Sequence, residues 1–322
     1  SAGTEATEAA LKLMRMNGQK NKKSKLGIIC IDGNWHGRTL GAQMMSGNPS
    51  QKEWIGYHDP NIHHIPFPYP WALNGKTGVE FLEMGLINLR KSGVDLENDI
   101  CGFMLETFQG WGAVFYPKEF VQAIEDICIK NNILLTFDEM QSGFARTGKK
   151  FGYEHYEVQA DLLCCGKGIA SGFPLSAVIG TAEIMDLPEV GDMSSTHSAN
   201  PFVCAAGMAT LEEIERMDLV NETDRKGLIF HQKLNELKLK YSDNISFVFG
   251  HGLLAALIFN LPNTNAPDTY LPSLISEKAM QKGLLIVHTG RESIKLGPPL
   301  TITDDALLEG LEVLDESIGE LN

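Results

Sequence analysis

The segment of residues 133–180 constrains the fold most, because it holds two short apolar runs that each end in reactive side chains. The run Ile133–Phe137 is followed by the acidic pair Asp138-Glu139, and the run Leu162–Cys165 by Gly166-Lys167-Gly168. Apolar runs of this length are typical of buried strands. Ligands of parallel sheets bind beyond the carboxyl ends of the strands. The pattern therefore predicts a carboxylate and a lysine at one edge of a sheet.

A lysine and a buried carboxylate suit a site for pyridoxal 5'-phosphate (PLP). Lys167 would form the Schiff base with the cofactor, and its flanking glycines would let ligands approach the backbone closely. Asp138 would hold the pyridine nitrogen protonated, which also gives a buried carboxylate its charged partner. The simpler interpretations are a surface lysine in a turn and an aspartate that caps a helix.

Strand-like and helical patterns alternate through the first two thirds of the chain. Further buried strands are predicted at Leu26–Asp32, Asp99–Glu106 and Leu175–Gly180, and helices at Glu5–Met16 and Phe120–Lys130. Continuous apolar strands separated by helices indicate an α/β fold with a largely parallel sheet covered on both faces.

The last third of the chain predicts a smaller α+β domain. Long helices at Asn200–Met217 and Leu219–Leu239 lead into apolar runs at residues 246–260 and 284–288 and a helix at Thr303–Ile318. We therefore predict a large domain at residues 1–217 and a small C-terminal domain at residues 218–322.

The composition limits the cellular compartment and the classes of partner that can be expected. The net charge of -14 argues against a nucleic-acid partner, and no apolar run is long enough to span a bilayer. The six cysteines show neither metal-site spacing nor a disulfide framework, which favours reduced thiols in a core. These features predict a cytoplasmic protein without a bound metal.

Five motifs occur in order between residues 3 and 168, within a likeness that runs from Ser1 to Pro298-Pro299-Leu300. They are Gly3-Thr4 at the start of the first helix, Trp35-His36-Gly37-Arg38-Thr39, the segment from Glu106 to Gly112 (ETFQGWG), Asp138-Glu139-Met140-Gln141, and Gly166-Lys167-Gly168. Together they resemble the class III PLP-dependent aminotransferases, the family of the ornithine, acetylornithine and 4-aminobutyrate enzymes. The resemblance implies PLP fold type I, like aspartate aminotransferase.

The resemblance also implies roles around the cofactor. Gly3 and Thr4 would bind its phosphate at the helix N-terminus, although Thr4 could instead be a plain N-cap. Trp35, where phenylalanine or tyrosine is commoner, would stack on the ring, followed in the same cofactor-binding motif by His36 in a structural role. Gln141 would approach the ring hydroxyl.

On the substrate side the chain departs from the family pattern. Lys295 stands where many relatives have an arginine, and lysine offers a point charge in place of a bidentate grip on a carboxylate. Glu106 matches a glutamate that pairs with that arginine in several relatives. His288 and Arg291 are nearby candidates for recognition of the substrate.

Two expectations concern the whole protein. Thr196 matches a threonine that relatives extend into the phosphate site of the neighbouring subunit, which implies an obligatory homodimer. The chain starts at Ser1 and enters a helix at once, whereas the family has a sizeable region ahead of that helix. We therefore expect a fragment, or a gene read from partway in.

The function predicted is transfer of an amino group from an amino acid or ω-amino acid donor to a 2-oxo acid acceptor, by ping-pong chemistry. An aminomutase, a racemase or a decarboxylase on the same fold needs the same lysine and aspartate. Gln141 and the Gln-Gly-x-Gly segment favour transamination. A PLP-free, non-catalytic relative is the third interpretation, and the intact Lys167 and Asp138 argue against it.

Overall fold

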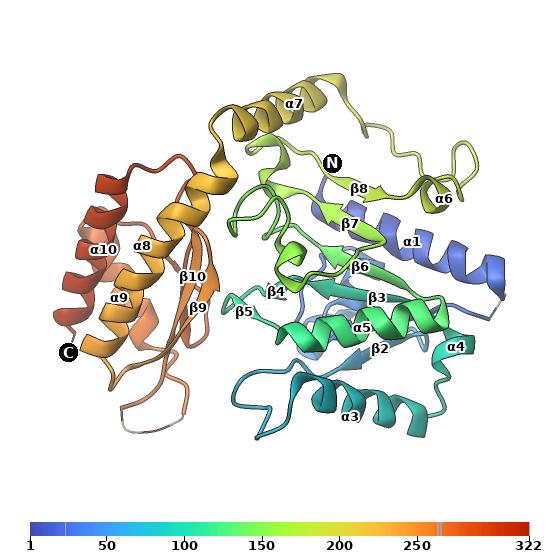
Figure 1. Cartoon of the computed structure of the whole chain (residues 1–322), viewed down its shortest axis with the longest axis horizontal. Helices are drawn as coiled ribbons and strands as arrows, with labels where there is room; N and C mark the ends of the chain where they lie inside the picture. The colour runs from blue at the N-terminus through green and yellow to red at the C-terminus, as the bar shows by residue number, and fades with distance from the viewer. Residues whose placement is uncertain (23, 263, 265, 322) are drawn as a thin grey trace. The chain divides into compact units, whose positions relative to one another are not determined.

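The computed structural model describes residues 1–22, 24–262, 264 and 266–321. The chain forms two compact units, each assembled from three segments (Figure 1). The N-terminal unit comprises Ser1–Phe108, Tyr116–Gly143 and Tyr153–Glu213, and the C-terminal unit comprises Gln109–Phe115, Phe144–Gly152 and Ile214–Asn322. The domain limits 1–217 and 218–322 stay a prediction.

A six-stranded sheet forms the centre of the N-terminal unit. In spatial order its strands are β2 (Ile62–Ile65), β1 (Gly27–Ile31), β3 (Ile100–Glu106), β6 (Leu134–Asp138), β7 (Leu162–Cys165) and β8 (Ala177–Gly180). Every neighbouring pair is parallel except β7 and β8. The prediction of a largely parallel sheet is confirmed. Strands β1, β3, β6 and β7 are buried along their whole length, as expected when helices cover both faces.

Helices cover this sheet on two sides. They are α1 (Gly3–Asn21), α2 (Leu40–Met45), α3 (Gly78–Lys91), α4 (Leu96–Asp99), α5 (Lys118–Asn131), α6 (Ala182–Met185) and the start of α7 (Pro201–Arg216), with short 3-10 turns η1 (Pro49–Ile55), η2 (Gly152–Tyr156) and η3 (Lys167–Ala170). Helix α1 packs across β3, β6, β7 and β8, while α3 and α5 pack on each other over the other face.

Helix α1 lies close to the sheet because the facing residues suit a tight contact. Its buried stripe includes Leu13 and Met14, which are spaced for one helix face with Ala6 and Ala10. Gly102 on β3 leaves room for Met14, since a Cβ at Gly102 would lie 2.1 Å from the sulfur. This contact fixes the helix, and with it the helix N-terminus, against the strands.

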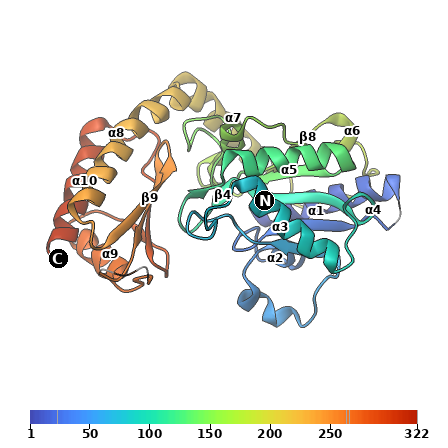
Figure 2. The same ribbon diagram turned by 60° about the horizontal axis from the view of Figure 1, so that its bottom comes forward.

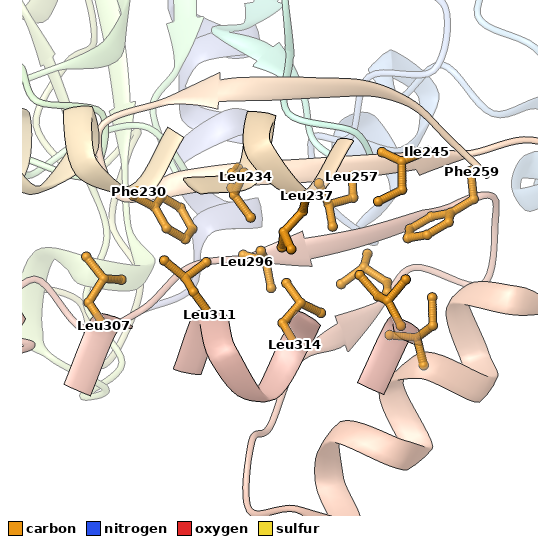
Figure 3. Packing of buried hydrophobic residues seen from close by; sticks show 14 of the residues in the cluster. Phe230, Leu234, Leu237, Ile245, Leu257, Phe259, Leu296, Leu307, Leu311 and Leu314 are labelled. Atoms are coloured by element: carbon orange, nitrogen blue, oxygen red, sulfur yellow. The ribbon is translucent and has the colours of Figure 1, made fainter. Parts of the chain in front are cut away.

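The C-terminal unit is built on a four-stranded antiparallel sheet. In spatial order its strands are β11 (Val287–His288), β12 (Ser293–Leu296), β10 (Leu254–Phe259) and β9 (Ile245–His251). Helices α8 (Leu219–Lys240), α9 (Leu271–Gln281) and α10 (Asp304–Gly319) pack with this sheet around an apolar core (Figure 3; Figure 2 gives a second view of the helices). Phe230, Leu257 and Leu314 are among the fully enclosed side chains of this core.

Most elements predicted from the sequence are present, and several were missed. β7 has the predicted limits, and α1, α5, α7, α8 and α10 match their predicted ranges within a few residues. Strand β2 and helices α3 and α9 had no predicted counterpart. Of the run at residues 284–288, only Val287–His288 is a strand.

Two observations concern the predictions made from the cysteines and from the apolar runs of the sequence. All six cysteines lie among the described residues and are free thiols, five of them buried. Within the part of the chain that the structure describes, no helix combines the length and apolarity needed to cross a membrane.

Candidate active site

Asp138 is the last residue of β6 and lies in the middle of the sheet edge. In register it is flanked by Glu106 on β3 and Cys164 on β7. The aspartate is only 4% exposed. Its Oδ1 accepts the Met140 N–H at 3.1 Å, and its Oδ2 lies 2.9 Å from His36 Nδ1. A buried carboxylate is therefore held in one orientation by two partners.

His36 is fixed behind this carboxylate. Its backbone N–H donates to Ser46 Oγ at 2.9 Å, and its carbonyl oxygen accepts from Thr7 Oγ1 at 2.7 Å. The ring is fully buried, and among the described residues its Nε2 has no hydrogen-bond partner. A carboxylate oxygen can only accept a hydrogen bond, so the ring nitrogen that faces Asp138 carries the hydrogen. We therefore place the ring proton on Nδ1, where it donates to Asp138.

Glu106 joins two further predicted residues. Its Oε2 accepts the backbone N–H of Trp35 at 2.8 Å, and its Oε1 accepts from Gln141 Nε2 at 3.2 Å. The Trp35 ring lies under the guanidinium of Arg38, 4.6 Å from the ring centroid. The glutamate is 5% exposed, so these bonds form away from bulk water. Glu106 thus fixes the backbone of the aromatic residue predicted to stack on the cofactor.

Lys167 follows β7 after one residue, Gly166, and begins η3. Its side chain is exposed, and its φ of 41° places it in the left-handed region. That conformation costs a non-glycine residue on the order of 1 kcal/mol and is commonest at functional sites. The neighbouring thiols are poor competitors as nucleophiles, because burial raises the pKa of Cys165 to about 12 and holds the pKa of Cys164 well above its usual value.

The N-terminus of α1 lies beside the backbone that carries Lys167. A Cβ on Gly3 would approach the Met140 sulfur to 2.7 Å, and one on Gly166 would approach it to 2.5 Å and the Gly3 Cα to 3.5 Å. Both glycines are thus needed for this close approach. Helix α1 begins at Gly3 with Ala2 as its N-cap, so the alternative of Thr4 as the N-cap is wrong.

Thr4 lies in the first turn of α1, and its hydroxyl has another partner. Thr4 Oγ1 lies 2.6 Å from Thr39 Oγ1. Gly37 allows this approach, because a Cβ there would lie 2.2 Å from Thr4 Oγ1. The helix N-terminus and the Trp35–Thr39 motif are therefore in direct contact.

These groups fit PLP. A buried acceptor for a protonated ring nitrogen (Asp138), an exposed amine (Lys167), an aromatic side chain (Trp35) and a helix N-terminus for a phosphate (Gly3) all belong to one sheet edge. The glycines at positions 3 and 166 add no side chain of their own at that edge, where the Met140 side chain lies close to both.

Two predicted residues lie elsewhere in the chain. Lys295 belongs to β12 of the C-terminal unit, where its Nζ donates to the Gly110 carbonyl oxygen at 2.8 Å. Thr196 lies in the fully exposed stretch of residues 191–200, ahead of α7. His288 and Arg291 also belong to the C-terminal unit, whereas the residues predicted at the cofactor site belong to the N-terminal unit with Asp138.

Sequence reasoning missed the contributions of Met140 and Thr39. The Met140 side chain lies next to both Gly3 and Gly166, and Thr39 binds the Thr4 hydroxyl. Both stand inside quoted motifs, but a methionine and a threonine carry no chemical signal of their own. Only the approach of α1 to the β7 loop gives them a role.

Comparison with known proteins shows the family of the chain. The family described as "Aminotransferase class-III" matches residues 1–318. The 4-aminobutyrate aminotransferase of Mycobacterium leprae is 34% identical over 99% of this chain and 72% of the relative. The acetylornithine aminotransferase of Caldanaerobacter subterraneus is 32% identical over 100% of this chain and 75% of the relative.

Solved structures give the same picture. An amine transaminase from an uncultivated Pseudomonas species in its PLP-bound form superimposes with a TM-score of 0.89 and 26% identity, covering 100% of this chain and 76% of that one. A transaminase from the marine bacterium Virgibacillus gives 0.90 and 25%, with coverage of 100% and 74%. The chain belongs to the class-III aminotransferases, which act with pyridoxal 5'-phosphate.

Proposed function

We propose that Lys167 and Asp138 are the catalytic pair of this aminotransferase, and that Gly3, Thr4, Trp35, His36 and Gln141 complete its cofactor site. The observation that carries the proposal is the buried Asp138, held by His36 Nδ1 at 2.9 Å. Asp138 lies one strand away from β7, which leads into the strained Lys167. This arrangement supplies an ionised acceptor and an amine at one edge of the sheet.

Each residue has a defined task. When bound, PLP supplies an aldehyde that links to amines and a ring that withdraws electrons from the carbon being deprotonated. Lys167 Nζ attaches the cofactor at rest and, once released, takes the proton from the donor carbon that carries the amino group. Asp138 accepts a hydrogen bond from the ring nitrogen and keeps it protonated. Trp35 covers the ring and excludes water.

The N-terminus of α1 favours a negatively charged group, whereas the Asp138–His36 pair favours a positively charged one. The first-turn N–H groups of α1 and the helix dipole favour a phosphate dianion. The carboxylate of Asp138 favours a cationic ring nitrogen. Together these two ends would hold the cofactor between them, next to the backbone of Gly166 that precedes Lys167 and lies close to Gly3 at the start of α1.

For the donor we propose an ω-amino acid such as 4-aminobutyrate or an ornithine-like compound, and for the acceptor 2-oxoglutarate or pyruvate. The relatives named 4-aminobutyrate and acetylornithine aminotransferase support the first part. We also propose that Glu106 lies on the substrate side of the site, and its contacts with Trp35 and Gln141 support this proposal.

The remaining proposals concern the assembly. We propose a cytoplasmic homodimer in which Thr196 reaches the phosphate site of the neighbouring subunit. The full exposure of residues 191–200 in a single chain supports this proposal. Residues 1–217 and 218–322 would be its large and small domains.

The test is an absorption spectrum of the PLP-loaded protein, followed by borohydride reduction and peptide mass analysis. We expect a band near ~420 nm and reduced cofactor on the peptide containing Lys167. Adding 4-aminobutyrate should bleach the band. Lys167→Ala should abolish both signals, whereas Lys20→Ala, an exposed lysine on α1, should keep them. Cofactor trapped on another lysine would refute the assignment.

A further inference from the structure

Strand β12 presents two different faces. Ile294 and Leu296 belong to the apolar core that the helices of the C-terminal unit cover (Figure 3). Side chains alternate along a strand, so Ser293 and Lys295 point to the opposite face. Arg291 lies two residues before Ser293 and continues that spacing. The register agrees, because Ser293 pairs with Ile258 and Lys295 with Ala256 on β10.

Ser293 and Lys295 of this second face, together with Arg291 just before the strand, contact one loop. Lys295 Nζ donates to the Gly110 carbonyl oxygen at 2.8 Å, and Ser293 Oγ donates to the Trp111 carbonyl oxygen at 3.0 Å. The Arg291 guanidinium lies over the Trp111 ring, 4.0 Å from its centroid. Three residues at i, i+2 and i+4 thus hold two consecutive loop residues through both backbone and side chain.

The loop itself is shaped for this contact. It joins β4 (Phe108–Gln109) to β5 (Val114–Phe115). Gly112 lies against β10, because a Cβ there would come within 3.4 Å of Ile258 Cδ1. Ala113 has a φ of 48°, a conformation that a free loop would seldom keep. The loop therefore depends on the surface of the C-terminal sheet for its conformation.

A second segment is held in the same way. Residues 144–152 also belong to the C-terminal unit, and the half-buried Arg146 donates through Nη1 to the carbonyl oxygens of Leu253 at 2.9 Å and Pro298 at 2.6 Å. This segment follows Gln141 along the chain by three residues, and the loop at Gly110 follows Glu106 by four. The two segments that follow Glu106 and Gln141 in the sequence are thus held by contacts within the C-terminal unit.

We propose that Lys295, with Arg291 and Ser293, is a positioning residue that fixes the loop of Gln109–Ala113 and, through the chain, the Glu106 carboxylate that holds Trp35. The inference rests on the proposed function. It gives Lys295 a role other than the carboxylate binding that its position in the sequence suggests. Lys295 then supports every substrate alike and does not select substrates by their carboxylate. Its ammonium donates a hydrogen bond to the Gly110 carbonyl oxygen, and a flexible point charge is sufficient for that contact.

The first readout needs neither cofactor nor activity. We would measure amide hydrogen exchange of peptides covering residues 109–115 in the apoprotein. Lys295→Met and Arg291→Leu should each accelerate exchange there by about five- to tenfold, the effect of losing one loop contact. Lys295→Arg keeps a donor and should restore protection. Lys233→Met, which removes an exposed lysine paired with Glu236 on α8, should change nothing.

The second readout is kinetic and separates the two roles of Lys295. With 4-aminobutyrate and with butylamine, its analogue without a carboxylate, Lys295→Met should lower kcat/KM by the same factor, about tenfold. Unchanged exchange in both variants, or a KM that rises only for 4-aminobutyrate, would overturn the inference. If the wild type turns over neither amine, the proposed donor class fails, and the exchange data still decide the role of Lys295.

Discussion

The two sheets of this molecule carry polar groups in different places. The six-stranded sheet is mostly parallel, and its central strands β1, β3, β6 and β7 are buried on both faces. Its reactive side chains, Asp138 and Lys167, therefore stand at or just beyond strand ends. The antiparallel sheet has one face on the helices and one face carrying Ser293 and Lys295. A sheet covered by helices on both faces leaves only its strand ends for chemistry, whereas a sheet covered by helices on one face can use alternate residues along a strand to hold a loop.

The largest expected effect is at the end of β6. Asp138→Asn keeps the shape and removes the charge, so the ring nitrogen loses its ionic partner. We expect kcat for 4-aminobutyrate to fall by about 10³-fold, about 4 kcal/mol. Single-turnover rates with PLP-loaded protein measure this directly. Asp126→Asn on the exposed face of α5 is the control. A fall of less than tenfold would mean that the charge of Asp138 does not support the reaction.

The difference between the sheets also explains what the sequence could reveal. Apolar runs that end in Asp138 and Lys167 are visible because a buried strand excludes polar residues until it ends. The contacts of Arg291, Ser293 and Lys295 leave no such pattern, since their partners are carbonyl oxygens and a ring far away in sequence. For the same reason the partnership of His36 with Asp138 could not be predicted, because it joins residues 102 positions apart.

Elements were missed where the local pattern was weak. Strand β2 contains two histidines between isoleucines, which reads as polar, although its register beside β1 makes it a strand. Helix α3 begins with a capping box in which Thr77 and Glu80 bind each other's backbone N–H groups. That signal stands in the sequence, but Gly78 and Gly85 weaken the helical propensity around it.

The second prediction compares the acid sensitivity of the two units. Burial lowers the pKa of His64 and of His231 to about 4. Both rings stay neutral when folded and take up a proton when unfolded below pH 6.5, so stability present at neutral pH is lost as the pH falls from about 6.5 towards 4. We expect each to remove about 2 kcal/mol by pH 5.

Urea unfolding of the apoprotein at pH 7.5 and pH 5 measures this loss. His64→Gln and His231→Gln should each make the unfolding free energy less dependent on pH in this window. Comparing the two variants shows whether the histidine of one unit accounts for most of the pH dependence. Equal pH dependence in the wild type and both variants would show that these rings do not control acid unfolding.

The third prediction tests the partner of Asp138. His36→Leu leaves Oδ2 without its donor, and we expect the dissociation constant of PLP to rise about tenfold, since an unpaired buried acceptor costs about 1–3 kcal/mol. An asparagine amide can occupy the position of Nδ1, so His36→Asn should stay within about threefold of the wild type. Fluorescence titration with PLP measures both. Equal losses in the two variants would point to packing of the ring in place of its hydrogen bond.

The smallest expected effect compares a helix cap in each unit. Thr77 Oγ1 accepts the Glu80 N–H at the start of α3, and Thr303 Oγ1 accepts the Ala306 N–H at the start of α10. Replacing either threonine by alanine should cost about 1 kcal/mol. Thr77→Ala should cost more, because Thr77 Oγ1 also contacts Glu80 Oε2 and the capping box is weakened with it. Hydrogen exchange of α3 and α10 locates each loss. If Thr77→Ala also loosens α10 to the same extent, the two units unfold as one, and the contrast drawn between their sheets does not extend to their stability.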